Sequence, residues 1–64
     1  MVKINGELSY VAGTSIEKYL LENGYDIKRV AVELNGDIIP KLKYGEICFQ
    51  DGDCVEIVSF VGGG

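Results

Sequence analysis

Apolar and polar residues alternate over the first ten positions of the chain. The apolar positions are Val2, Ile4, Leu8 and Tyr10. A period of two predicts strand, turn, strand, and Asn5-Gly6 is a strong hairpin signal because both residues tolerate a positive φ. A two-residue loop would pair Ile4 with Glu7, whereas a three-residue loop would place Ile4 opposite Leu8. The hydrophobic pattern therefore predicts the longer loop, with a bulge.

The next segment changes to a helical period. Thr14 is the predicted N-cap, and Glu17 completes the capping box. One apolar stripe follows, made of Ile16, Tyr19 and Leu20. Gly24 supplies the stop, and a helix of about ten residues is too short to persist without packing on a sheet. Tyr19 has two interpretations, a ligand contact or a core residue, and an aromatic residue at helical spacing is far more often core.

A second hairpin is predicted over residues 30–38. The five residues that begin at Leu34 repeat the design of those that begin at Ile4: apolar, Asn-Gly, acidic, apolar. Pro40 cannot donate to a ladder, so the strand before it belongs at an edge or ends there. Residues 41–45 indicate one short helical turn, and residues 47–49 predict a minimal strand.

Residues 53–61 form the last long apolar segment and lead into three glycines. Two hairpins can form one sheet, covered by one helix, only if another strand lies between the hairpins and pairs with both. We therefore expect this segment in the middle of a mixed sheet, parallel to the first strand, with Val55 and Ile57 facing the helix. The predicted fold is α+β, a ubiquitin-like β-grasp with two hairpins and one main helix on one face. We expect a domain over residues 1–61 and a flexible glycine tail over residues 62–64.

Charge narrows the function classes. Six basic and ten acidic residues give a net charge of −4 with no basic cluster, which argues against nucleic acid and anionic membranes as partners. No apolar run approaches the ~20 residues of a membrane span. The chain opens into alternation rather than into a signal peptide, so we expect a cytoplasmic protein.

The chain has two cysteines and no histidine. Cys48 and Cys54 lack the C-x-x-C spacing of metal sites and cannot complete a four-ligand zinc site, so no metal is expected. We interpret them as half-buried apolar residues, since a disulfide would need an oxidising compartment. Without histidine, the usual general base for a nucleophile is missing, and we expect no self-contained enzyme.

Two C-terminal segments carry a family resemblance. Residues 30–40, VAVELNGDIIP, and residues 51–58, DGDCVEIV, together with a Gly-Gly end, resemble the sulfur carrier proteins of thiamine biosynthesis, the ThiS family. The similarity covers nearly the whole chain, and the N-terminal hairpin matches in pattern alone. Relatives in molybdopterin synthesis share the fold and the Gly-Gly end but are typically longer. One departure is a third glycine, Gly62, before Gly63-Gly64.

The resemblance implies a protein that acts as a reagent. The carboxylate of Gly64 would be adenylated with ATP by an E1-like enzyme and then converted to a thiocarboxylate. A persulfide enzyme would supply the sulfur, and thiazole synthase would accept it. Gly62 and Gly63 would form a stalk narrow enough for a partner's channel. No cofactor is expected to remain bound, because ATP is used by the activating enzyme.

Docking on those enzymes needs an exposed surface. If Val55 and Ile57 face the helix, alternate residues of the same strand face the open side of the sheet. The partner-binding residues that we expect are Glu56, Val58, Phe60 and Val61. Ala31 and Glu33 are expected to border this patch. In the alternative interpretation, Phe60 folds back over the sheet as additional core.

Three other functions are compatible with the same residues. The first is a sulfur carrier for molybdopterin synthesis, which uses the same tail with another acceptor. The second is a ubiquitin-like modifier joined to lysines of target proteins. The third is a β-grasp interaction module whose glycines carry no chemistry.

Overall fold

The first hairpin turns at Asn5 and Gly6. In the computed structural model, which describes residues 1–60, β1 (Val2–Ile4) and β2 (Glu7–Ser9) are antiparallel, and Ile4 pairs with Glu7. The predicted three-residue loop is wrong. Asn5 and Gly6 adopt φ values of 51° and 85°, as a type I′ turn requires, and this turn matches the twist of the strands. The apolar character of Leu8 does not indicate the register, because its side chain lies on the open side of the sheet and is 62% exposed.

The second hairpin has the same construction, as predicted. It joins β3 (Val30–Leu34) to β4 (Asp37–Ile38), and Leu34 pairs with Asp37 across Asn35 and Gly36. The φ values of these two turn residues are 51° and 90°. β4 is a short strand at the sheet edge that ends two residues before Pro40, which confirms the expectation drawn from the proline.

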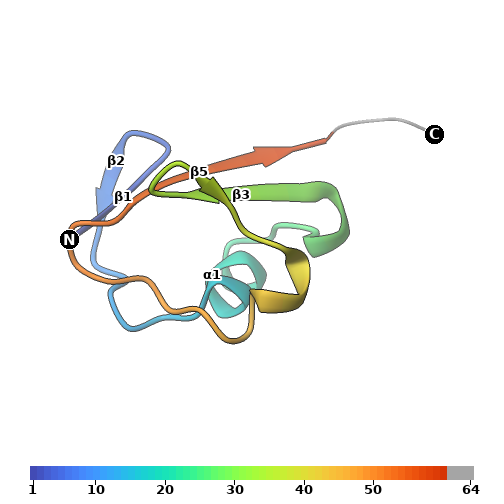
Figure 1. The fold of residues 1–64 in the computed structure, drawn as a ribbon, viewed down its shortest axis with the longest axis horizontal. Coiled ribbons are helices and arrows are strands. Elements are labelled where there is room, and N and C mark those ends of the chain that lie inside the picture. The colour runs from blue at the N-terminus through green and yellow to red at the C-terminus, as the bar shows by residue number, and fades with distance from the viewer. Residues whose placement is uncertain (61–64) are drawn as a thin grey trace.

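The final strand β5 (Cys54–Ser59) lies in the middle of the sheet (Figure 1). The strand order is β2-β1-β5-β3-β4; β5 is parallel to β1 and antiparallel to β3. Val55 and Ile57 are buried on the helix side, with 1% and 6% of their surface exposed. The predicted α+β, ubiquitin-like β-grasp arrangement is confirmed.

Helix α1 (Ile16–Glu22) starts one residue later than predicted. Ser15 is the N-cap, and its Oγ accepts a hydrogen bond from the Lys18 N–H at 3.1 Å. Thr14 is therefore not the cap. Its carbonyl instead accepts a hydrogen bond from the Phe49 N–H at 2.9 Å, and α1 begins only at Ile16. The helix has seven residues rather than about ten.

The connections between the main elements are short turns. Gly24, with a φ of 76°, follows the helix C-cap as predicted, and the 3₁₀ turn η1 (Ile27–Arg29) leads into β3. The predicted helical turn after Pro40 is the 3₁₀ turn η2 (Lys41–Lys43). Residues 47–49 contribute a single bridge, from Cys48 to Ser15, rather than a strand of the sheet.

The core lies between α1 and one face of the sheet. Its buried apolar residues are Val2, Ile4, Ile16, Leu20, Val30, Val32, Tyr44, Phe49, Val55 and Ile57. Tyr19 is partly buried against this cluster, and its ring meets that of Phe49 edge-on at a centroid distance of 5.7 Å. Tyr19 is thus a core residue, as its helical spacing indicated.

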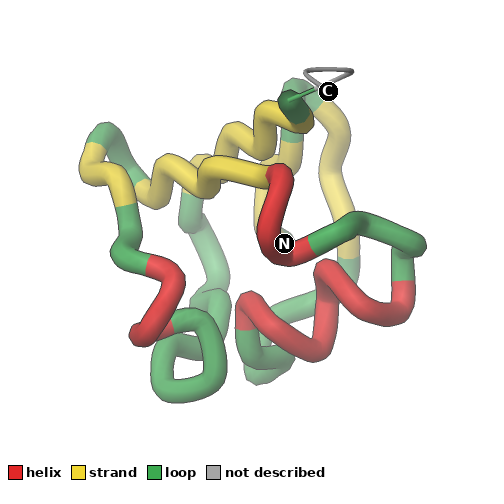
Figure 2. Tube along the Cα trace, turned by 90° about the vertical axis from the view of Figure 1, so that its right-hand side faces the viewer, coloured by secondary structure: helices red, strands yellow, loops and turns green. Residues whose placement is uncertain are grey.

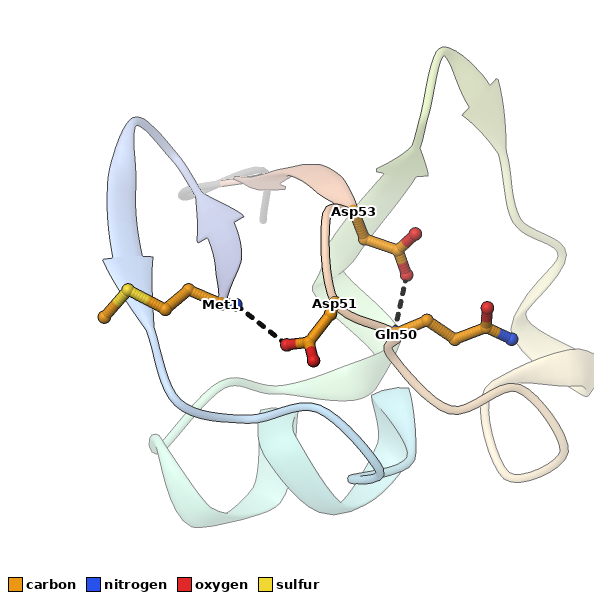
Figure 3. A network of polar contacts seen from close by, with 4 residues as sticks. All are labelled: Met1, Gln50, Asp51 and Asp53. Carbon is orange, nitrogen blue, oxygen red and sulfur yellow. Dashed lines mark hydrogen bonds and ion pairs between the residues drawn. The ribbon is translucent and has the colours of Figure 1, made fainter.

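The loop before β5 is tied to the start of the chain (Figure 3). The Met1 amino group lies 2.8 Å from Asp51 Oδ1, and the Met1 carbonyl accepts a hydrogen bond from the Gly52 N–H at 2.8 Å. The Asp53 carboxylate accepts a hydrogen bond from the Gln50 N–H at 2.8 Å. These contacts close the turn that leads into β5 and fix where that strand begins.

One face of the sheet is covered and the other is open. Figure 2 shows α1 and the connecting turns on the same side of the strands. No helix within residues 1–60 is long and apolar enough to cross a membrane. The predicted tail over residues 62–64 and the domain boundary at Val61 lie outside the described residues.

Candidate functional site

The open face of the sheet exposes apolar side chains at the end of β5. Val58 is 54% exposed and Phe60 is 61% exposed. Phe60 therefore does not fold back over the sheet as additional core. Cys54 and Glu56, at alternate positions of the same strand, are exposed as well. The sequence prediction of which β5 residues face away from the helix is confirmed.

Strands β3, β4 and β5 surround a shallow hollow on this face, which we call the open-face hollow. Its volume is about 280 Å³, and its lining residues are Ala31, Val32, Glu33, Ile38, Glu56, Val58 and Phe60. Ala31 and Glu33, which were expected to border the patch, do line it. Ile38, which is 74% exposed, is not among the residues that the sequence predicts for this surface. A two-residue loop after Leu34 places Ile38 opposite Glu33, so the correct register would have revealed it.

A second hollow lies beside β1, at the start of β5. It has a volume of about 230 Å³ and is lined by Met1, Lys3, Leu8, Gly52, Asp53 and Cys54. Cys54 is exposed there, and Cys48 is exposed elsewhere; both are free thiols. The prediction that both cysteines are half-buried is wrong. Cys54 follows the strand alternation onto the open face, and Cys48 lies in a segment outside the sheet.

Two turn asparagines fix the position of β5. Asn5 accepts a hydrogen bond from the Ile57 N–H at 2.7 Å, and Asn35 accepts one from the Cys54 N–H at 2.9 Å. At the other end, the Phe60 N–H donates to the Arg29 carbonyl at 2.7 Å. The sequence predicts turns at both asparagines but not these contacts. One signal for these contacts was available in the sequence. Both hairpins have Asn, and not Asp or Gly, at the first position of the turn.

The remaining predicted site residues are Val61, Gly62, Gly63 and Gly64, and they lie outside the described residues. Phe60 is thus the last described residue before them. Its N–H is bonded to the Arg29 carbonyl in η1, while its side chain is exposed. The site that the structure presents is therefore the apolar surface at the end of β5.

Titratable groups with shifted pKa values lie on the covered side of the sheet. Burial raises the pKa of Tyr44 above its usual 10.0, and a backbone hydrogen bond with Val32 opposes this shift. Burial also raises the pKa of Tyr19, with smaller contributions from Tyr25 and Glu7.

Within residues 1–60 no group of three or more His, Cys, Asp or Glu side chains is placed to hold a metal ion.

A mixed sheet with its last strand in the middle, one packed helix and an apolar open face at the end of β5 define a ubiquitin-like β-grasp protein. Within that class, the chain belongs to the ThiS family, whose model matches residues 2–64. The match includes all three C-terminal glycines.

Individual relatives agree with this membership. The chain is 38% identical to the sulfur carrier protein ThiS of Thermus thermophilus, over the full length of both. It is 47% identical over 62 residues to a thiazole synthase of Paramagnetospirillum magneticum; the match covers 95% of this chain and 19% of that protein. This chain thus spans about a fifth of the synthase. The crystal structure of the thiamine biosynthesis protein ThiS from Geobacter metallireducens superposes with a TM-score of 0.77 at 31% identity, covering 98% of this chain and 97% of that one.

Proposed function

We propose that this protein is a sulfur carrier for synthesis of the thiazole ring of thiamine. It would serve as a protein co-substrate on which other enzymes act. The observation that carries the proposal is the family match over residues 2–64, which includes the glycines at 62–64. The similarity to a segment of a thiazole synthase supports that enzyme as the sulfur acceptor.

The first chemical step activates the Gly64 carboxylate. A free α-carboxyl has a pKa near 3.3–3.7, so it is an anion at neutral pH and a poor electrophile. One carboxylate oxygen attacks the α-phosphorus of ATP on an E1-like enzyme. The bond to pyrophosphate breaks, pyrophosphate leaves, and an acyl-adenylate with a good leaving group remains.

The second step introduces sulfur. The terminal sulfur of a persulfide on the donor enzyme attacks the carbonyl carbon of the acyl-adenylate, and AMP leaves with the electron pair of the broken C–O bond. A thiol then cleaves the S–S bond of the resulting acyl disulfide. The products are the Gly64 thiocarboxylate and a disulfide between the thiol and the donor. The thiocarboxylate sulfur is then available to thiazole synthase.

The described fold supports this role through its open face. Val58 and Phe60 form an exposed apolar surface four or more residues before Gly64. The four residues from Phe60 to Gly64 span at most roughly 14 Å when extended, so a partner that reacts at Gly64 must dock close to the folded domain. Glycines at positions 62 to 64 suit a narrow, water-excluding channel, since they carry no side chain.

A reconstituted thiazole-forming assay tests the proposal. It contains this protein, an E1-like activating enzyme, ATP, a persulfide donor and thiazole synthase. We expect thiazole to form when all components are present and to stop when this protein is omitted. A synthase that is active with another carrier but forms no thiazole with this one would overturn the proposal. Formation of molybdopterin instead, with the matching synthase, would move the protein to that pathway.

A further inference from the structure

Two acidic residues are neighbours in the lining of the open-face hollow. Glu33 on β3 and Glu56 on β5 are direct register partners, and both line the hollow. Two positions further along the same strands, Asn35 lies opposite Cys54, and the Asn35 N–H donates a hydrogen bond to the Cys54 carbonyl. Because such bonds occur at every second pair, the Glu33–Glu56 pair is hydrogen-bonded through its backbone, with Cα atoms about 5.5 Å apart.

Within residues 1–60, no ion pair neutralises these two carboxylates. Like charges directly opposite in a sheet are destabilising. The ion pairs within residues 1–60 join the Met1 amino group to Asp51, Arg29 to Asp26 and Lys43 to Glu46, and none of them includes Glu33 or Glu56. Glu33 is only half-exposed, and its cross-strand neighbour on β4 is apolar Ile38. We therefore expect repulsion between the two carboxylates to cost some stability in the free protein.

We propose that this acidic pair receives an arginine side chain of thiazole synthase when the two proteins dock. This inference rests on the proposed function and names the chemistry of the partner at the same site. Two acidic side chains bordered by apolar ones are complementary to a side chain with a cationic head and an apolar stem. The protein's own charge of −4 favours a basic partner surface as well.

Arginine fits the hollow better than lysine. Its guanidinium has five N–H donors in a fixed planar fork, which allows simultaneous hydrogen bonds to two carboxylates. The exposed ring of Phe60 lines the same hollow and offers a flat face to a guanidinium, and Val58 offers a surface to the stem. Contact with the arginine would remove the repulsion between Glu33 and Glu56. A partner without such a cation would bury two carboxylates unpaired.

Binding of the full-length proteins tests the proposal. Affinity for thiazole synthase is measured by isothermal titration calorimetry for the wild type and for Glu33→Gln and Glu56→Gln, at two salt concentrations. We expect each variant to bind about tenfold more weakly, because it leaves a buried charge without one of its partners. We also expect the affinity of the wild type to fall more steeply with salt.

Two controls separate recognition from folding. Glu22→Gln removes an exposed carboxylate from α1, on the opposite side of the sheet, and should leave the affinity within about twofold of wild type. The thermal midpoint of Glu33→Gln and Glu56→Gln should stay level or rise by about 1–4 °C, since a repulsion is relieved. A variant that is at least as stable yet binds more weakly has lost a recognition contact.

The failures of the two proposals are distinguishable. If the wild type supports thiazole formation and both glutamine variants bind the synthase within about twofold of it, the acidic pair is not the arginine receptor. The proposed function then stands. If the wild type supports no thiazole formation with an active synthase, the proposed function fails, and the inference fails with it.

Discussion

The side chain of Asn5 takes the place of a strand residue beside Ile57. Its Oδ1 accepts a hydrogen bond from the Ile57 N–H at 2.7 Å, and its Nδ2 donates to the Ile57 carbonyl at 3.2 Å. β1 ends at Ile4, so this contact continues the pairing of β5 beyond the end of its neighbour. On the other side, Asn35 accepts a hydrogen bond from the Cys54 N–H. The two hairpin turns thus hold the central strand from both sides.

Asn5→Gly should destabilise the protein by about 2 kcal/mol, because two part-buried hydrogen bonds are lost while glycine tolerates the positive φ. Asn35→Gly is the matched control: it has the same φ of 51° and also loses two side-chain hydrogen bonds, but at exposed positions. We expect a smaller loss there, about 1 kcal/mol. Urea unfolding measures both. Equal losses would show that the Asn5 contacts have no particular weight.

Phe60→Ala should weaken docking on partner enzymes while changing the free energy of unfolding by less than about 0.5 kcal/mol, since the ring is 61% exposed. Phe49→Ala provides the contrast. Its ring is 1% exposed in the core, and truncation should cost about 3–5 kcal/mol. Affinity for the activating enzyme and urea midpoints give the two readouts. Unchanged affinity of Phe60→Ala would remove the aromatic ring from the interface.

Strong base should destabilise the protein in part through Tyr44. Burial raises its pKa above 10.0 in the folded state, so its contribution is fully present below pH 10. It is lost as the pH rises through the folded pKa, because the unfolded chain releases the proton first. Urea midpoints at pH 8 and pH 11 should therefore differ less in Tyr44→Phe than in the wild type. Tyr10→Phe, whose ring is 89% exposed, is the control, and an identical loss in all three proteins would contradict the prediction.

The sequence predicted the elements and their order because the signals are local. Alternation, two Asn-Gly pairs and one helical stripe each act within about ten residues, and the central position of β5 follows from the need to join two hairpins. The open-face patch at Val58 and Phe60 follows from the same alternation. Local pattern thus predicted the fold class and every lining residue of the open-face hollow except Val32 and Ile38.

The errors occur where distant residues decide the outcome. Thr14 has the residue type of an N-cap, but its carbonyl pairs with Phe49, so the cap moves to Ser15. Leu8 has the pattern of a core residue yet lies on the open face. The contact between Glu33 and Glu56 depends on the register of two strands more than 20 residues apart, which alternation does not determine.

The intact mass of the protein after incubation with an E1-like activating enzyme, ATP and a persulfide donor tests the central claim most directly. We predict a mass gain equal to the replacement of one oxygen by sulfur. A variant lacking Gly62, Gly63 and Gly64 should show no gain and should keep the unfolding midpoint of the wild type, because the core residues in the described part of the chain lie between Val2 and Ile57. Attachment of the protein to other polypeptides would indicate a modifier. An unchanged wild-type mass, with an activating enzyme shown to be active on another carrier, would contradict the sulfur-carrier function.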